Sequence, residues 1–304
     1  MVSLQPAIAV AIASFRARHL LEASLESILP QAQAIGAPVV VARDISCGDI
    51  DEFSRAFPTV RFVPAPPQVG IPRLRALALA QTRGAWAALT EDNSVADPDW
   101  LVRLLAASDG VEVVGGAMDN AQRARLTDWG AFFSEYGFFA TGGGKNAKCP
   151  LITGANVAYR RDAIDKVLEL ASQGEWENVI HFHLAAAGAR LRFAPEARIR
   201  QNLRYTFQAF CLDRYEHGRD YARRRLQDEG RRRWLYLSGA LVLPLLQTLR
   251  VARATDPGNR GVFLRALPFT FAFLAAWSLG EAVGYWRGAT SAPEHYSIPA
   301  KKNI

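Results

Sequence analysis

The sequence predicts an α/β protein with a mostly parallel central sheet and a helical C-terminal tail. In the first part of the chain, short apolar runs alternate with segments of helical spacing, as in a doubly wound sheet. One apolar run ends directly in acidic residues, and an arginine-rich stretch leads into two long apolar segments. With 304 residues, half of them hydrophobic, the chain can bury a full core plus a smaller appendage.

The elements follow from the apolar pattern in chain order. Ile71–Thr82 is assigned as a helix because Leu74, Leu77 and Ala78 recur at helical spacing, whereas Ala7–Ala13 is short enough to be a strand. We expect strands at Ala7–Ala13, Pro38–Ala42, Arg61–Pro64, Ala85–Leu89 and Val111–Gly115, and helices at His19–Ala34, Ile71–Thr82, Asp99–Ala107 and Arg161–Leu170.

The tetrapeptide Thr90-Glu91-Asp92-Asn93 follows the apolar run Trp86–Leu89. Ligands of open α/β sheets collect outside the carboxyl ends of the strands. An acid pair at that edge can coordinate Mg²⁺ or Mn²⁺ while substrate phosphates complete the shell. Alternatively, Asn93 or Asp97 caps the helix that starts near Asp99. The residues by themselves leave a metal site and a helix cap equally open.

Other site classes find little support in the sequence. The three cysteines are scattered, which argues against a disulfide framework or a zinc site and favours a reducing compartment. His181 and His183 are two apart, so on a helix they would face different sides and neither is assigned as a metal ligand. The segment Met1–Ser14 lacks a basic start, and we expect no secretory signal.

The net charge of +7 is concentrated in one segment. Between Arg190 and Arg233 there are thirteen arginines against six acids, which accounts for the whole excess. No zinc-finger or RNA-recognition signature accompanies them, so we expect no nucleic-acid partner. The segment leads instead into apolar sequence, so we expect its positive charge to face anionic lipid.

Two apolar segments follow the arginines, Trp234–Val251, which Pro244 interrupts, and Val262–Trp286. They predict a helical hairpin whose uncharged cores are shorter than the roughly 20 residues that cross a bilayer. Aromatic residues near their ends and the arginines suit an anionic membrane surface. We expect helices that lie in or dip into one leaflet rather than a full span; the alternative is a buried helical subdomain or a dimer interface.

The order of motifs resembles the inverting family 2 glycosyltransferases of the GT-A fold, from Ala7 to about Gln201. Four blocks of the first half carry the resemblance. Val10–Leu29 is similar to the family's nucleotide-binding start, and Val39–Ser46 to its acid-presenting strand. Gly70–Ala76 is similar to its Gly and Arg-Asn block, and Glu91–Leu101 to its aspartate motif. Downstream, Gly154–Arg161 resembles the family's acceptor-side block and Gly174–Glu177 the segment of its catalytic base. Gly188–Ala197 resembles its closing strand. The tail motif Trp277–Tyr285 resembles bacterial members that act on lipid-linked or exported glycans.

The resemblance implies roles for individual residues. Glu175 is the first choice for the general base and Glu177 the second, with a solvated helix face as the alternative for Glu177. A divalent cation, Mg²⁺ or Mn²⁺, would be held by Glu91 and Asn93. Contacts to the nucleotide sugar would come from Ser14, Arg16, Asp44, Arg73, Arg75, Asp92 and Asn156, with Asp44 on the base edge and Asp92 near the ribose.

This chain departs from the family pattern at four positions of the matched region. Arg43 replaces the first usual Asp of its block, Ala76 replaces Asn, and Gln201 stands where many members have His. Asn93 provides one negative charge fewer than an acid, which should weaken divalent binding. These changes leave room for a weakly metal-dependent or an inactive relative.

The resemblance and the tail together predict a membrane-associated glycosyltransferase of polysaccharide or cell-envelope synthesis. It would transfer sugar from a nucleotide-diphosphate sugar to a lipid-linked or glycan acceptor at the cytoplasmic side of the plasma membrane. The alternative is a non-catalytic scaffold that binds nucleotide sugar or membrane in a polysaccharide assembly complex. We expect four parts: a GT-A domain at 1–202, Arg-rich amphipathic connecting helices at 203–233, the apolar hairpin at 234–290 and a polar tail at 291–304.

Overall fold

A computed structural model describes residues 6–140, 150–229 and 233–288. The chain forms two compact units, one made of residues 1–121 and 139–202, the other of residues 122–138 and 203–304. The chain passes from one unit to the other for the third time after residue 202, where a boundary was expected, whereas the sequence pattern did not set residues 122–138 apart. The four-part division stays a prediction, and its polar tail at 291–304 lies outside the described residues.

The first unit is built on an eight-stranded sheet in the order β3-β2-β1-β4-β7-β6-β8-β5. Four of its strand pairings are parallel and three are antiparallel, so the expected α/β fold with a mostly parallel sheet is confirmed. The strands are β1 Ile8–Ser14, β2 Val39–Asp44, β3 Val60–Ala65, β4 Trp86–Glu91, β5 Ser94–Ala96, β6 Val113–Asn120, β7 Val157–Arg160 and β8 Leu191–Gln201.

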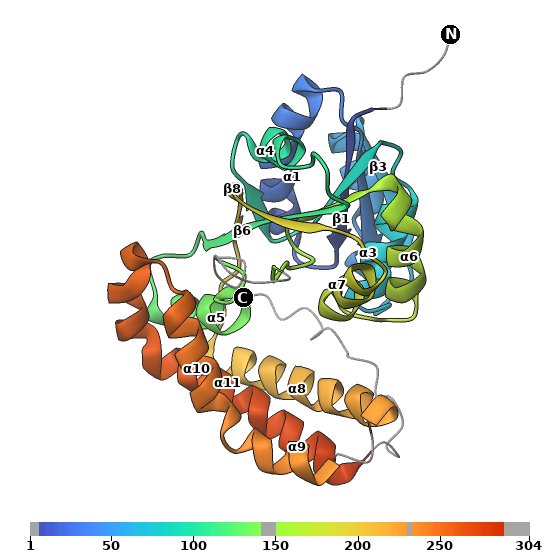
Figure 1. Cartoon of the computed structure of the whole chain (residues 1–304). Coiled ribbons are helices and arrows are strands. Elements are labelled where there is room, and N and C mark those ends of the chain that lie inside the picture. Colours follow the sequence, from blue (N-terminus) through green and yellow to red (C-terminus); the bar gives the residue numbers. More distant parts are fainter. Residues whose placement is uncertain (1–5, 141–149, 230–232, 289–304) are drawn as a thin grey trace. The chain divides into compact units, whose positions relative to one another are not determined.

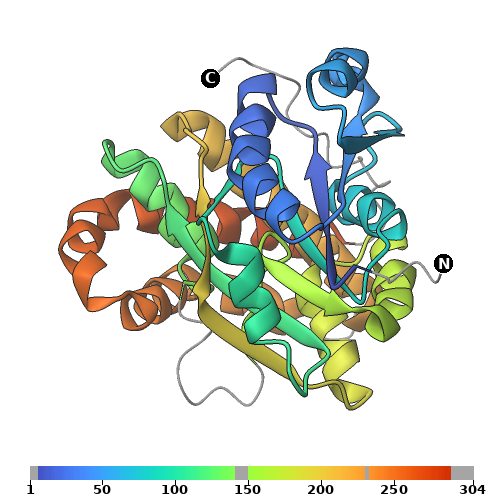
Figure 2. The ribbon, with the colours of Figure 1, turned by 90° about the horizontal axis from the view of Figure 1, so that it is seen from above.

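Helices cover both faces of this sheet. On one face lie α1 (Arg18–Ala34) and α4 (Trp100–Ala106), and on the other lie α3 (Ile71–Ala80), α6 (Arg161–Ser172) and α7 (Glu177–Ala186) (Figure 1). Figure 2 shows α1 beside β1. The short helices η1 (Ile45–Cys47) and α2 (Ile50–Ala56) join β2 to β3. Because it is covered on both sides, β1 is buried at every residue, as its unbroken apolar sequence requires.

The register of the central strands positions the polar residues that follow them. β1 and β4 are parallel neighbours, with Ala13 opposite Glu91. Their carboxyl ends therefore meet at one edge, and the loop after β1 faces the acids that end β4. The apolar core beneath this edge includes Leu74 of α3, Leu89 of β4 and Ile180 of α7.

The second unit is helical. Its elements are α5 (Leu126–Tyr136), α8 (Phe207–Glu229), α9 (Arg233–Ala240), α10 (Leu243–Ala254), η3 (Pro257–Asn259) and α11 (Arg260–Arg287). Figure 2 shows the turn from α10 to α11 from above. Aromatic pairs join α8 to α11, among them Phe210 and Phe273 with ring centroids 4.7 Å apart.

The apolar hairpin differs in one respect from the sequence expectation. Its first arm is not one helix, since α9 and α10 are bent by 64° at the break between Ala240 and Leu243. Pro244, in the first turn of α10, cannot continue a helix from α9 because it lacks the N–H that such a helix needs. Among the described residues, one helix, Pro257–Arg287, is long and apolar enough to cross a membrane, and a third of its most apolar window is buried. The bent pair α9–α10 passes the same test only when it is taken as a single span.

Candidate active site

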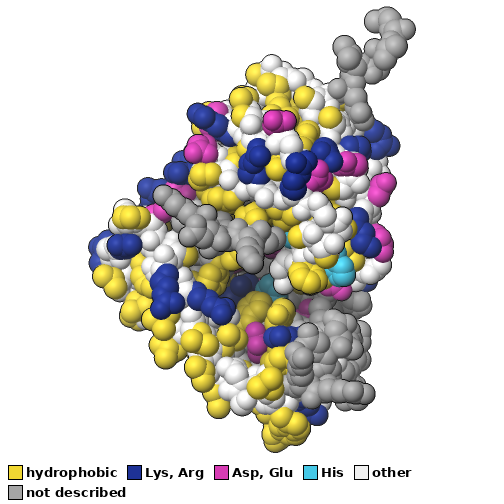
Figure 3. All heavy atoms as spheres, in the orientation of Figure 1, with side chains coloured by type: hydrophobic (Ala, Val, Ile, Leu, Met, Phe, Trp, Pro, Cys, Tyr) yellow, Lys and Arg dark blue, Asp and Glu magenta, His cyan; other side chains and the backbone are white. Residues whose placement is uncertain are grey.

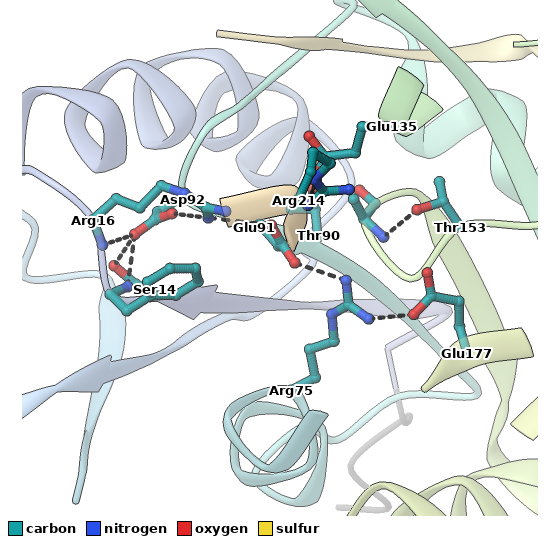
Figure 4. Close-up of polar contacts among 12 residues, drawn as sticks. Ser14, Arg16, Arg75, Thr90, Glu91, Asp92, Glu135, Thr153, Glu177 and Arg214 are labelled. Atoms are coloured by element: carbon teal, nitrogen blue, oxygen red, sulfur yellow. Dashed lines mark hydrogen bonds and ion pairs between the residues drawn. The ribbon is translucent and has the colours of Figure 1, made fainter. Parts of the chain in front are cut away.

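Asp92 holds the loop between β1 and α1 in place through hydrogen bonds. Its Oδ2 atom accepts hydrogen bonds from the Ser14 hydroxyl at 3.1 Å and from the backbone N–H groups of Phe15 at 2.7 Å and Arg16 at 2.6 Å. The Arg16 guanidinium reaches the other carboxylate oxygen at 3.0 Å (Figure 4). Asp92 is fully buried, so these donors replace the water that its charge would otherwise need.

Glu91 lies between two arginines. Arg75 donates to its Oε1 atom at 2.7 Å and Arg16 to its Oε2 atom at 3.2 Å. Burial by itself would raise the pKa of Glu91, but the charges and hydrogen bonds of Arg75 and Arg16 outweigh it and hold the pKa below its ordinary value. The carboxylate is therefore ionised at neutral pH, inside a positively charged surrounding.

Arg75 links this strand edge to α7. Its second terminal nitrogen donates to Glu177 at 2.8 Å, so that the guanidinium lies between Glu91 and Glu177 (Figure 4). Gly154 makes room for it, because a Cβ atom there would lie 2.2 Å from Arg75 Nη1. Burial opposes the charge of Arg75, yet the two carboxylates raise its pKa further above the ordinary arginine value.

A small pocket, with room for about one water molecule in this structure, lies beside this ion pair. Its lining includes Arg75, Gly154, Tyr159, Glu175 and Glu177. Within the described residues, the half-buried Glu175 carboxylate has no hydrogen-bond or ion-pair partner, in contrast to Glu177. A carboxylate without a partner, next to a positive group in a pocket, is suited to accept a proton from a bound hydroxyl.

Tyr159, which lines the pocket, also contacts a histidine behind it, and sequence reasoning did not predict this contact. The Tyr159 hydroxyl and His181 Nε2 are 2.9 Å apart, and both side chains are buried. Burial lowers the pKa of His181 to about 4, so the imidazole is neutral at pH 7. Tyr159 and His181 are 22 residues apart, and no local spacing in the sequence indicates that they meet.

The comparisons with known proteins agree with this architecture. Residues 6–243 match the family model described as glycosyltransferase-like family 2, which is well over half of the chain. The chain belongs to this glycosyltransferase family. The protein is accordingly a glycosyltransferase that uses a nucleotide-sugar donor, and the family expected from the order of its motifs is confirmed. No curated protein matches the chain in sequence.

Two solved glycosyltransferases are similar in structure. A mannosyltransferase from Pyrobaculum calidifontis in complex with GDP-Man and Mn²⁺ has a TM-score of 0.56 at 15% identity, covering 94% of this chain and 88% of that one. GalNAc-T7 with UDP, GalNAc and Mn²⁺ has a TM-score of 0.50 at 13% identity, covering 66% of this chain and 45% of that one. At these identities the likeness shows the fold, which is the expected GT-A fold.

Three residues that the sequence assigned to the donor site of this glycosyltransferase lie outside the network around Glu91. The Asp44 carboxylate accepts from the backbone N–H groups of Ser46 at 2.8 Å and Gln68 at 2.9 Å. Arg73 is exposed and donates to a backbone carbonyl of α6, that of Ser172. The arginine that contacts the Asp92 carboxylate is Arg16.

Asn156 is the third of these residues. Its fully buried amide accepts from the Trp100 indole at 2.9 Å and donates to two backbone carbonyls, those of Ala117 and Ala197. This amide joins a helix to two strands, and the bonds account for both of its N–H donors. The amide thus holds strands of the sheet together, and its assignment to the donor site of the glycosyltransferase stays a prediction.

Arg43, which stands where family members have an acid, is also part of the support. Its guanidinium is buried, pairs with Asp49 through two bonds of 2.6 and 2.7 Å, and donates to the Ser14 hydroxyl at 2.6 Å. Ser14 in turn donates to Asp92. Arg43 therefore helps to fix the orientation of Asp92, although it touches neither carboxylate oxygen itself.

The structure also distinguishes the two sequence interpretations of Asn93. Asp99 is the N-cap residue of α4, and its side chain makes no capping hydrogen bond. Asp97 pairs with Arg200 at 2.9 Å. Asn93 is buried, and its Nδ2 atom has no hydrogen-bond partner. An unpaired buried amide next to Glu91 calls for a further partner, which is consistent with a ligand at this edge and not with a helix cap.

A cation at this edge would need the substrate to help hold it, because both Glu91 oxygens already accept from arginines. Among residues 6–140, 150–229 and 233–288, no three His, Cys, Asp or Glu side chains form a metal-binding group. Mg²⁺ is commonly held by one or two carboxylates together with substrate phosphates. Glu91 supplies a carboxylate, and the Asn93 amide can be turned to present its oxygen.

Proposed function

We propose that the protein is an inverting glycosyltransferase that transfers a sugar from a nucleotide-diphosphate donor to a lipid-linked or polysaccharide acceptor. The observation that carries the proposal is the position of Arg75. It joins the acids at the end of β4 to the pocket that contains Glu175 and Glu177. Residues suited to a diphosphate and residues suited to deprotonating an acceptor hydroxyl thus belong to one connected site.

On the donor side, the residues neutralise charge. Arg16 and Arg75 bring two guanidinium groups to the buried Glu91. When a nucleotide diphosphate binds, these groups are suited to stabilise the negative charge that develops as the diphosphate leaves. Asp92 is fully buried and holds Ser14 and the backbone of Phe15 and Arg16, so its proposed part in donor binding is to position this loop.

A divalent cation would be held here by Glu91 and Asn93 with the donor phosphates. It would supply further charge neutralisation on the leaving diphosphate. Because Asn93 adds no negative charge, the arginines take a larger share of this task than in an enzyme with two metal-binding acids. The Mn²⁺ ions named for the two similar structures support a divalent cation for this chain as well.

On the acceptor side, Glu175 is the proposed general base. It removes the proton of the acceptor hydroxyl as that oxygen forms a bond to the anomeric carbon. The bond between the anomeric carbon and the diphosphate oxygen breaks on the opposite face, which inverts the configuration. Glu177 is occupied by Arg75, and we assign it the positioning of that guanidinium.

The acceptor and location are inferred from the C-terminal helices. The arginine-rich segment before them and the apolar helix Pro257–Arg287 support association with an anionic membrane surface. A membrane-associated enzyme that uses a cytosolic nucleotide sugar meets lipid-linked or growing polysaccharide acceptors at the cytoplasmic face. This setting corresponds to synthesis of cell-envelope polysaccharide.

Binding and turnover together test the proposal. UDP and GDP sugars are titrated with and without Mn²⁺, and transfer to lipid-phosphate and oligosaccharide acceptors is followed by release of nucleotide diphosphate. We expect binding and turnover, with inverted configuration in the product. Donor binding without hydrolysis or transfer would instead support a non-catalytic scaffold of a polysaccharide assembly complex. Retained configuration would contradict the inverting mechanism.

A further inference from the structure

Many of the exposed apolar side chains of the helical unit lie on two features. The first is a stripe along α11 made of Leu264, Phe271, Leu279 and Trp286, each between 44% and 66% exposed. Spacings of seven and eight residues place these four on one face of the helix. Figure 3 shows hydrophobic side chains, with Lys and Arg among them, over the region where α10 and α11 lie.

The second feature is the bend between α9 and α10. Leu241, Val242, Leu245 and Leu246 surround it, with exposed fractions from 47% to 82%. Leu241 at the break is the most exposed of them. Contiguous apolar surface of this extent is typical of a site that binds a protein or a membrane.

The other face of α11 is bound along α8. A Cβ atom at Gly218 of α8 would lie 2.2 Å from the Trp277 carbonyl, and one at Gly280 of α11 would lie 2.0 Å from the Tyr215 carbonyl. Gly284 approaches the backbone of Arg219 in the same way. These contacts bring the two helix backbones together over several turns, so α11 cannot be surrounded by lipid.

The partner helix α8 is too polar to cross a bilayer. Its 23 residues, Phe207–Glu229, include ten charged side chains. Moving α11 into a transmembrane position would carry these charges into the hydrocarbon or strip α8 from α11. Each charge at the centre of a bilayer is costly. The packing therefore favours a position of α11 at the membrane surface.

Charges around the apolar features identify the surface that fits them. Between Arg233 and Arg287 there are six arginines and only two acids, Asp256 and Glu281. Five of the arginines are exposed, and they lie at or near helix ends: Arg250, Arg253, Arg260, Arg265 and Arg287. Lipid phosphates are their natural partners when the neighbouring apolar side chains enter the acyl region.

We infer that α9, α10 and α11 lie in the plane of one leaflet of an anionic membrane and that no segment of this unit crosses it. The α11 stripe and the α9–α10 bend enter the lipid, while the arginines contact headgroups. The inference rests on the membrane association in the proposed function and extends it, because the packing of α11 on α8 gives a structural reason for the surface position that the sequence favoured.

A matched pair of variants tests the binding surface. Val242 at the bend and Val102 on α4 are both 51% exposed. The full chain is floated with vesicles that contain phosphatidylglycerol or only phosphatidylcholine. We expect binding to the anionic vesicles, about tenfold weaker binding of Val242→Glu, and unchanged binding of Val102→Glu. Equal loss in both variants would contradict the assigned surface, as would a dimer in solution that Val242→Glu dissociates.

The topology is tested by labelling both ends of α11. In a variant without native cysteines, Gly258→Cys and Arg287→Cys are each bound to sealed vesicles and treated with a membrane-impermeant maleimide. We expect both to be labelled from outside without detergent. Protection of one end alone means that α11 spans the bilayer, which overturns this inference but supports membrane association. Absence of vesicle binding overturns both, whatever the transfer assay shows.

Discussion

Arg75 and Glu177 form an ion pair of 2.8 Å that joins α3 to the first turn of α7. The two residues are 102 positions apart in the sequence. Because the same guanidinium also holds Glu91, a shift in the position of Arg75 would act on the end of β4 and on the pocket of Glu175 at the same time.

Removal of Arg75 should destabilise the protein strongly. An Arg75→Met variant keeps the length of the stem but leaves the buried Glu91 carboxylate with Arg16 alone and Glu177 unpaired. We expect a loss of about 3–5 kcal/mol in the free energy of unfolding, measured by urea denaturation. Arg73→Met, on the exposed side of the same helix, is the control and should change little. Similar stabilities for the two variants would refute the central role of Arg75.

The two pocket glutamates should differ in their effect on turnover. Glu175→Gln should lower kcat by about 100-fold or more with little change in the KM of the donor, because the general base is lost. Glu177→Gln keeps a hydrogen bond to Arg75 and should cost less. The exposed Glu169→Gln serves as control. If kcat falls more in Glu177→Gln than in Glu175→Gln, the assignment of the base has to be exchanged.

The residue at position 93 should set the strength of cation binding. Asn93→Asp adds a negative charge beside Glu91, so we expect Mn²⁺ to bind about tenfold more tightly in the presence of nucleotide diphosphate. Without the metal, the same variant should be less stable than wild type, because the added charge is buried. Calorimetric titration measures the first effect and thermal unfolding the second.

The control for this position is Asn178→Asp, at an exposed site of α7. It should change neither Mn²⁺ affinity nor stability. Equal affinities of wild type and Asn93→Asp for Mn²⁺ would remove position 93 from the cation site.

Stability should decrease on mild acidification because of His181. Between pH 6.5 and about 4 the unfolded chain binds a proton at this imidazole and the folded chain does not. The free energy of unfolding should therefore fall by about 3 kcal/mol as pH falls through this range. The loss should be much smaller in His181→Gln, and His183→Gln, at an exposed position, should behave like wild type. An unchanged pH slope in His181→Gln would show that other groups cause the loss.

Much of the fold could be predicted from local sequence. The expected segment Ala7–Ala13 corresponds to β1, and Ile71–Thr82 to α3, with ends displaced by one or two residues. Apolar periodicity can be recognised from residues close together in the sequence. The side chains that it marks are buried in the core on both faces of the sheet. The short strand β5 was not anticipated, since Ser94–Ala96 is only three residues long and is defined by its pairing with β8.

The candidate site was predictable in part. The order of family motifs marked Glu91, Asp92 and Arg75 before any contact was known, and the structure places them in one network. The order of the motifs did not indicate that the Asn156 amide bonds within the sheet or that Glu177 is the second partner of Arg75. Hydrogen-bond partners of this kind depend on which strands and helices become neighbours.

The acids that follow β4 are a property of the sequence alone, as are the arginine-rich segment and the apolar tail. Only the tertiary structure decided that Glu91 lies between Arg16 and Arg75 and that α11 is bound along the polar α8. It also decided that Glu175 shares a pocket with Arg75 but has no partner among the residues that the structure describes. The physical reason is that pattern and composition act along the chain, whereas charge pairing, burial and helix contact act between residues far apart in it.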